Sequence, residues 1–357
     1  MESPQHVKEL LKTEAQNLGF VLFGCARPGN LPAHEAYQAW LKEGGHAGME
    51  YLARPQALLA RADPALLLPG IKTLICLAMP YRLLPSPAQE DSGNEGIIAT
   101  YACFEDYHTH IKEKLGRLAG TLATLSPEAK YRVCVDADPI LEKAYAQQAG
   151  LGWIGENTLL FNKQFGSQLL LAELLTTLEL PPDAPLQDDP CAQCGRCIKA
   201  CPTGALTGKH SMKASCCLSF LTIENRGNIP TEFRPSLGNR VFGCDACQTA
   251  CPYNEAASTK PFDTPLRQML NPHVNLHEEL LLDEKTFKAK YADTPVLRAK
   301  HKGYLRNIII AAANAGQSHF LPSLCALQKQ ATDSILQEML AWAIEKLSKA
   351  NQAPLPR

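Results

Sequence analysis

The sequence predicts an α/β domain, followed by a cysteine-rich module and a helical tail. Short strand-like runs alternate with helix-like stretches over residues 1–185, which is typical of α/β domains. Nine of the 14 cysteines fall within residues 186–260, and amphipathic helical patterns fill much of residues 261–357. We therefore expect three domains with these boundaries.

The first range is expected to open with a helix and to contain four strands. Val7, Leu10, Leu11 and Leu18 recur near helical spacing. The expected strands span residues 20–25, 73–78, 132–135 and 168–174. A proline-rich stretch, residues 180–190, then reads as an exposed linker into the second range.

Successive amphipathic helices are expected from about Tyr304 to Ile344. Apolar residues recur at helical spacing in three segments, which Gly316 and residues 331–333 separate. A short stack of paired helices, as in helical repeat proteins, explains this pattern.

The cysteines of the second range follow the bacterial ferredoxin pattern for iron–sulfur clusters. A Cys-x-x-Cys-x-x-Cys-x-x-x-Cys-Pro run is followed by a second copy that lacks only its first cysteine. In two-cluster ferredoxins the cysteine before proline binds the other cluster. One 4Fe-4S cluster is thus expected on Cys191, Cys194, Cys197 and Cys251. The other is expected on Cys201, Cys244, Cys247 and either Cys216 or Cys217.

Zinc and disulfides are the alternative explanations for these cysteines. Structural zinc usually pairs two separated Cys-x-x-Cys elements, whereas here three close cysteines precede Cys-Pro. Disulfides are disfavoured because the N-terminus does not resemble a secretory signal. The remaining cysteines lie mostly in apolar segments, where buried, inert thiols are expected: Cys25, Cys76, Cys103, Cys134 and Cys325.

Composition indicates an ordinary globular chain of 357 residues, 45% hydrophobic and 20% charged. No apolar run approaches the roughly 20 residues of a membrane span. The net charge of −1 leaves only a local patch as a possible nucleic-acid surface. We expect a cytoplasmic monomer.

The segment from Val135 to Thr158 is the strongest candidate for a reaction site in the first range. A strand ending at Asp136, a helix begun by Pro139 and a glycine-rich turn place a carboxylate beside backbone that can approach a flat ligand. The alternative is that Asp136 or Asp138 only caps the helix. Neither a dinucleotide-binding glycine motif nor a P-loop is present in the sequence.

These motifs together resemble the epoxyqueuosine reductase family. The resemblance covers almost the whole chain and includes the Asp136 segment, the doubled cysteine motif and the segments 217–224 and 238–252. It implies a nitroreductase-like α/β domain that binds cobalamin, a ferredoxin-like module with two 4Fe-4S clusters, and a HEAT-like helical domain that helps to hold tRNA. The implied reaction reduces epoxyqueuosine at the wobble position of tRNA to queuosine, with an external electron donor.

The resemblance also assigns roles to residues. It makes Asp136 the proton donor and Cys217, not Cys216, the eighth cluster ligand. The residues that it places at the cobalamin are Arg61, Tyr101, Asp136, Leu160, Leu171, Ser219, Thr222 and Asp245. The chain departs from the family pattern at Glu156, where lysine is common, and at Phe104, where glycine is usual.

The chemistry of the residues fits this reaction. Removal of an epoxide oxygen needs two electrons and a proton donor, and cobalamin can supply the low-potential electrons that side chains cannot. To hold a proton near neutral pH, Asp136 needs a pKa well above its usual value of about 3.9, which burial can cause. Ile111 stands where the Asp-x-His-x-x-Gly corrinoid motif has glycine, so no lower histidine ligand is expected from this segment.

A basic stretch at the start of the tail favours RNA binding. Arg298, Lys300, Lys302 and Arg306 offer phosphate contacts, and Tyr291 or Tyr304 could stack on a splayed base. A solvated charged face is the alternative explanation for such a run.

Two other functions stay open at this point. A reductive dehalogenase would use the same cofactors on a small organohalide, but residues 1–20 contain no arginine for a twin-arginine export signal. A non-catalytic iron–sulfur electron carrier is the other alternative.

Overall fold

The computed structural model describes residues 3–83, 93–186, 190–191, 193–258 and 264–352. The helices and strands of the first range are α1 (Pro4–Asn17), β1 (Leu22–Ala26), α2 (Pro32–Lys42), α3 (Pro55–Ala62), β2 (Thr73–Pro80), β3 (Glu95–Ile98), α4 (Tyr107–Leu125), β4 (Tyr131–Cys134), α5 (Glu142–Gln148), β5 (Trp153–Ile154), β6 (Leu160–Phe161) and β7 (Leu169–Thr176). The predicted first helix is confirmed as α1, and the four predicted strands are confirmed as β1, β2, β4 and β7.

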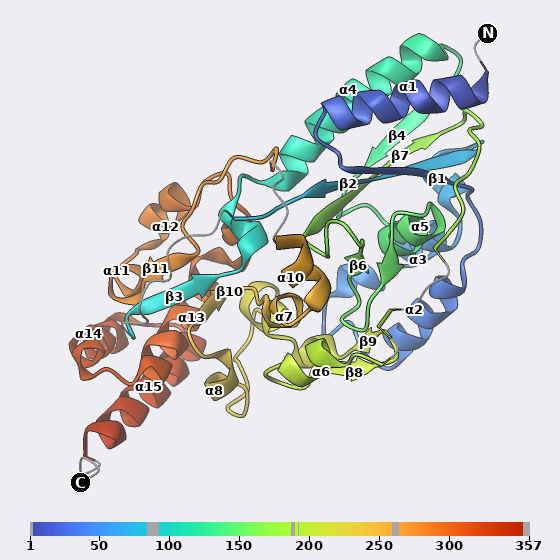
Figure 1. The fold of residues 1–357 in the computed structure, drawn as a ribbon. Helices are drawn as coiled ribbons and strands as arrows, with labels where there is room; N and C mark the ends of the chain where they lie inside the picture. Colours follow the sequence, from blue (N-terminus) through green and yellow to red (C-terminus); the bar gives the residue numbers. More distant parts are fainter. Residues whose placement is uncertain (1–2, 84–92, 187–189, 192, 259–263, 353–357) are drawn as a thin grey trace.

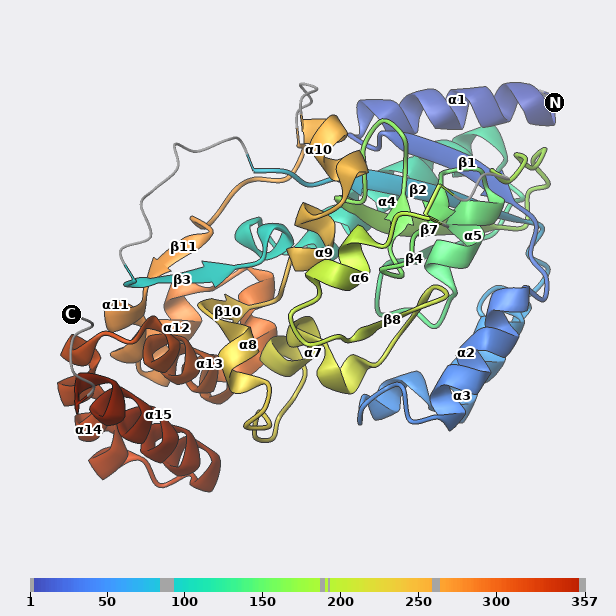
Figure 2. The same cartoon turned by 60° about the horizontal axis from the view of Figure 1, so that its bottom comes forward.

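The main sheet has the strand order β1-β2-β7-β4, and each neighbouring pair is antiparallel. Alternating strands and helices usually build a parallel sheet. Here the connection from β1 to β2 passes through α2 and α3, which lie away from the sheet (Figure 2). Because that connection does not cross the sheet, the two strands can run in opposite directions.

Helices cover both faces of the main sheet (Figure 1). Along β2, Ile75 and Leu77 pack in one core with α1 and α4, whereas Cys76 and Ala78 pack in another core with α5. Successive side chains of a strand point to opposite faces, so one fully buried strand serves two cores.

The second range folds into short elements joined by turns. These are α6 (Arg196–Ala200), β8 (Leu206–Gly208), β9 (Ser211–Met212), α7 (Leu218–Ile223), α8 (Arg234–Leu237), β10 (Arg240–Phe242), α9 (Ala246–Thr249) and α10 (Pro252–Ser258). Of the expected linker, residues 187–189 lie outside the described residues.

The third range contains β11 (His273–Asn275), α11 (Leu276–Leu280), α12 (Glu284–Lys290), α13 (Lys300–Ala315), α14 (Leu321–Gln330) and α15 (Ser334–Gln352). The predicted amphipathic helices are confirmed as α13, α14 and α15. Helix α13 is the central one, since residues 304–313 are all buried.

A second sheet joins the three ranges. In it β3 lies between β10, which is parallel to it, and β11, which is antiparallel (Figure 1). Ile98, Phe242 and Ile308 share one core. Packing therefore continues across the expected boundaries near residues 185 and 260, and sequence composition does not reveal which distant strands pair.

No helix within the described ranges is both long and apolar enough to cross a membrane.

Candidate active site

A cavity of about 1810 Å³ opens between the main sheet, the cysteine-rich segment and the start of the C-terminal range. Five of the residues predicted to contact a cofactor line it: Arg61, Tyr101, Asp136, Ser219 and Asp245. Ligand pockets usually have volumes of about 300–1,000 Å³. This cavity is therefore large enough for a big cofactor together with part of a substrate.

The side chains of three residues predicted to contact the cofactor pack away from this cavity. Leu160 and Leu171 belong to the core under α5, and their neighbours Leu159 and Leu169 line the cavity instead. Thr222 is 1% exposed; its hydroxyl donates to the Leu218 carbonyl at 2.7 Å and accepts from the Gly243 N–H at 2.9 Å. The family motif identified the segments but not the face that each side chain takes.

The loop after β4 directs Asp136 into the cavity. The strand ends at Cys134, and Asp136 adopts a positive φ of 50°. Residues other than glycine rarely adopt such an angle. Two carboxylates hold the loop: Glu142 Oε1 accepts from the Asp136 N–H at 2.7 Å, and Asp138 Oδ2 accepts from the Val135 N–H at 3.1 Å. Helix α5 starts only at Glu142 and has no side-chain cap, so the capping alternative is wrong for both aspartates.

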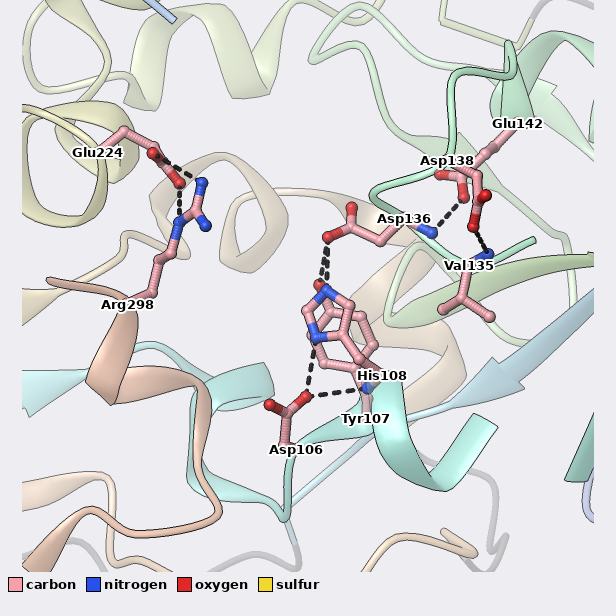
Figure 3. Close-up of polar contacts among 9 residues, drawn as sticks. All are labelled: Asp106, Tyr107, His108, Val135, Asp136, Asp138, Glu142, Glu224 and Arg298. Atoms are coloured by element: carbon pink, nitrogen blue, oxygen red, sulfur yellow. Dashed lines mark hydrogen bonds and ion pairs between the residues drawn. The ribbon is translucent and has the colours of Figure 1, made fainter. Parts of the chain in front are cut away.

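Asp136 ends a chain of three ionisable side chains (Figure 3). Its Oδ2 lies 2.7 Å from His108 Nε2, and His108 Nδ1 lies 2.8 Å from Asp106 Oδ1. The Tyr107 hydroxyl also donates to Asp136 Oδ2, at 3.1 Å. Asp106 is the N-cap of α4 and accepts from the His108 N–H, which fixes the start of the helix that carries both rings.

The proton of this chain resides on His108 and not on Asp136. Burial raises the Asp136 pKa, but hydrogen bonds from His108 and Tyr107 and the charges of His108 and Arg298 outweigh burial, so the pKa is lowered. Burial lowers the His108 pKa, but its hydrogen bonds and attraction to Asp106 and Asp136 raise that pKa to about 9. The expected rise in the Asp136 pKa is therefore wrong for this arrangement, because the neighbouring imidazole outweighs the effect of burial.

Sequence reasoning missed His108 as part of the site. His108 was considered only as a metal-ligand motif, although an Asp-x-His step at a helix start places the imidazole next to its own capping carboxylate. Glu142 is almost wholly enclosed, and burial together with the Asp136 charge raises its pKa to about 8. It holds the loop by accepting from the Asp136 N–H. The Asp136 side chain itself stays 53% exposed, in the cavity.

An ion pair of Arg298 with Glu224 faces the Asp136 loop (Figure 3). Arg298 donates to both oxygens of Glu224, at 2.7 and 3.2 Å. Both residues line the cavity, and the Arg298 guanidinium lies over the Tyr51 ring. Arg298, predicted to bind RNA, is thus placed at the cavity, where it also stabilises the charge of Asp136.

The cluster cysteines separate into two groups of four. Cys191, Cys194, Cys197 and Cys251 line a second, much smaller cavity. Cys201, Cys217, Cys244 and Cys247 lie on the wall of the large cavity. Of the two adjacent described cysteines, Cys217 lines the large cavity and Cys216 lines neither.

Both groups have the donor chemistry that a cubane cluster needs, four thiols each. Within the described residues, no three His, Cys, Asp or Glu side chains converge as they would around one metal ion. A cubane needs no such convergence, because its four cysteines bind four different irons.

The basic stretch divides into exposed and buried members. Lys300 and Lys302 are exposed, and Lys302 pairs with Asp333 at 2.5 Å. Arg306 is only 1% exposed and donates to the carbonyls of Leu221, Asn225 and Gly227. Its prediction as an RNA contact is wrong, and so is base stacking by Tyr291 or Tyr304, which are buried and hydrogen-bonded to Glu279.

Two family models match parts of the chain. A 4Fe-4S double cluster binding domain matches residues 190–254, and the model described as epoxyqueuosine reductase QueG, DUF1730 matches residues 61–137. Both matched ranges include residues that line the large cavity.

Curated relatives and solved structures match nearly the full length. An epoxyqueuosine reductase of Vibrio cholerae is 38% identical over 98% of this chain and 94% of its own. One of Pseudomonas aeruginosa is 36% identical over 96% of this chain and 95% of its own. A crystal structure of epoxyqueuosine reductase with an epoxyqueuosine-modified tRNA-Tyr stem loop is 29% identical, with a TM-score of 0.89 over 99% of this chain and 96% of that one.

Proposed function

Because the chain belongs to the epoxyqueuosine reductase family, we propose that it reduces epoxyqueuosine in tRNA to queuosine in its large cavity. One observation carries this proposal. The cavity has the Asp136–His108 pair on one wall and the cysteines Cys201, Cys217, Cys244 and Cys247 on another. A proton source and an electron source therefore face the same space.

The reaction needs both sources. Two carbon–oxygen bonds of the epoxide break, a carbon–carbon double bond forms, and the oxygen leaves as water. Two electrons and two protons balance this change. Positioned general acids typically contribute 10² to 10⁴ to such a rate.

The cavity fits cobalamin by size and by its polar groups. Arg61 presents a buried Nη1 that has no hydrogen-bond partner among the described residues, and Tyr101, Ser219 and Asp245 line the same space. These groups suit the amide side chains of a corrinoid. When bound, cobalamin supplies low-potential electrons to the substrate, and the clusters supply electrons to cobalamin. Both ring nitrogens of His108 are already engaged by carboxylates, which supports the expectation that it is not a cobalt ligand.

Asp136 and His108 together deliver one of the two protons. His108 holds it below about pH 9, and its Nε2 is hydrogen-bonded to the carboxylate that faces the substrate space. The proton can pass along this 2.7 Å contact to Asp136 as negative charge develops on the leaving oxygen. Asp106 stabilises the imidazolium from the far side and fixes the orientation of the ring.

The tRNA is expected to reach the cavity over its basic edge. Arg298 lies at the cavity itself, and the exposed Lys300 and Lys302 follow it at the start of α13. A tRNA substrate also implies that the enzyme works in the cytoplasm. One chain supplies every group named here, so a monomer suffices.

Anaerobic conversion of tRNA carrying epoxyqueuosine tests the proposal. Protein that contains about eight irons, four per cluster, should bind added cobalamin and convert this tRNA to the queuosine form. Clusters that load while cobalamin fails to bind would contradict the proposal and favour an electron carrier. Turnover of an organohalide instead of the tRNA would favour the dehalogenase.

The Asp136→Asn variant tests the proton donor in the same assay. Asparagine keeps the shape of the side chain but is not a carboxylic acid, so single-turnover reduction should slow by roughly 10² to 10⁴. Iron content, cobalamin binding and tRNA binding should stay unchanged. A wild-type rate would remove Asp136 from the reaction.

A further inference from the structure

The β5–β6 hairpin, residues 153–161, lies against both groups of cluster cysteines. Trp153 and Phe161 pack with Cys251 in a small core, and the Trp153 indole stacks on Phe161 and meets the edge of Tyr253. The indole is only 2% exposed, and its Nε1–H donates to Cys191 Sγ at 3.3 Å. A rigid, buried donor therefore points at a sulfur of the smaller cavity.

The turn of the same hairpin carries a second donor. Asn157 is 3% exposed and lines both cavities. Its Oδ1 accepts from the Leu159 N–H at 3.3 Å, which orients the amide. Its Nδ2 is buried and has no hydrogen-bond partner among the described residues. Asn157 and Cys247 both line the large cavity.

The turn is built to hold Asn157 in this place. The Gly155 N–H donates to the Leu159 carbonyl at 2.8 Å, and the Thr158 N–H donates to the Gly155 carbonyl at 2.8 Å. A Cβ on Gly155 would lie 2.7 Å from the Phe161 ring and 3.2 Å from Asn157 Oδ1. The turn therefore has no room for a side chain at position 155.

A buried amide N–H without a partner is costly, by about 1–3 kcal/mol. Such a group is usually retained because it binds something. Reduction adds negative charge to an iron–sulfur cluster, and N–H donors to its sulfurs stabilise that charge, which raises the reduction potential.

We propose that this hairpin tunes both clusters, Trp153 through Cys191 and Asn157 through Cys247. The inference rests on the cluster assignment of the proposed function and adds a role for residues outside the ligand set. Since Asn157 lies between the two cavities, one short turn controls the difference in potential between the clusters. That difference sets the direction in which electrons pass toward the substrate space.

Redox titration of the purified protein, followed by electron paramagnetic resonance, tests the proposal. Trp153→Phe removes the indole donor and keeps an aromatic ring, so one of the two midpoint potentials should fall. Asn157→Asp keeps the acceptor for the Leu159 N–H but replaces the donor by an oxygen, so mainly the other potential should fall. Trp342→Phe, on α15 and remote from both cavities, is the matched control and should change neither.

Iron content separates this proposal from the cluster assignment. Wild-type protein that lacks two clusters would overturn both. Two loaded clusters whose potentials ignore both substitutions, or two variants that shift the same potential, would overturn the tuning role alone.

If the variants fail to load clusters, a measurement on wild-type protein tests the same contacts. Nitrogen-15 labelling of tryptophan or asparagine should give a resolved nitrogen coupling to one reduced cluster in pulsed electron paramagnetic resonance spectra. Absence of both couplings would contradict the two donor contacts.

Discussion

At the scale of single residues, the reactive carboxylate depends on its neighbours more than on its own burial. Asp136 faces the cavity, His108 donates to it, and Asp106 supports His108 from behind. Asp106 and Asp136 attract the charged imidazole, and Arg298 acts on Asp136 from its other side. The cationic form of His108 is therefore the stable one at neutral pH.

The pH dependence of turnover should report this imidazole. Because the His108 pKa is raised to about 9, turnover should be retained through neutral pH and should fall as pH rises through about 9, where the proton is lost. Asp106→Asn keeps a helix cap but removes one of the two charges that raise the pKa. Its alkaline limb should move to lower pH, measured as single-turnover rate against pH. An unmoved limb would assign the proton to another group.

The same pKa shift contributes to folding stability. A histidine with a raised folded pKa stabilises the native state fully below its unfolded pKa, near 6.5, and this contribution disappears as pH rises through about 9. The loss of stability therefore occurs between about pH 6.5 and pH 9, and the contribution is complete at lower pH.

At the scale of elements, α13 separates two kinds of basic residue that look alike in sequence. Its first turn presents Lys300 and Lys302 to solvent, whereas one turn later Arg306 is buried and binds three backbone carbonyls of residues 221–227. The N-terminal end of this helix can contact RNA, while its middle anchors the cysteine-rich segment.

Substitutions on α13 should therefore have opposite effects. Lys300→Ala with Lys302→Ala should weaken tRNA binding at low salt and reduce the slope of log affinity against log salt by about 1 per lost phosphate contact, with little change in Tm. Arg306→Ala should leave buried carbonyls without donors and destabilise the fold by roughly 3 kcal/mol, seen as a lower Tm. An unchanged salt slope in the double variant would exclude this end of α13 from the RNA surface.

The sequence predicted the elements better than their partners. The positions of β1, β2, β4, β7 and α13–α15 followed from apolar periodicity, which is local information. The burial of Arg306, the departure of Leu160 and Leu171 from the cavity, and the Asp136–His108 contact depend on residues far away in the chain. The two groups of cysteines were an exception, since the ferredoxin motif itself indicates which cysteines bind the same cluster.

At the scale of the whole molecule, the two cysteine groups exchange members between distant segments. Cys251 lies with Cys191, Cys194 and Cys197, although it comes near the other end of the module. In return Cys201 joins Cys217, Cys244 and Cys247 at the large cavity. Each group of four therefore draws its thiols from both halves of the module.

Cysteine replacements should reveal this exchange. Cys251→Ser should damage the cluster of the smaller cavity, and Cys217→Ser should damage the cluster beside the large one, each measured by iron content and resonance spectra. Cys216→Ser is the adjacent control and should retain about eight irons, four per cluster. Loss of iron in the Cys216 variant, with retention in the Cys217 variant, would exchange the roles of these neighbours.

The three-stranded sheet around β3 has a consequence for how the protein is made. Residues 95–98 leave the ribosome early, yet their partners on both edges, residues 240–242 and 273–275, are synthesised much later. Until then β3 presents two unpaired edges, a state that invites aggregation and chaperone binding. The smaller cavity also cannot form until Cys251 has been synthesised. Iron–sulfur loading is thus a late event in biogenesis, and slow translation after residue 98 would lengthen the vulnerable period.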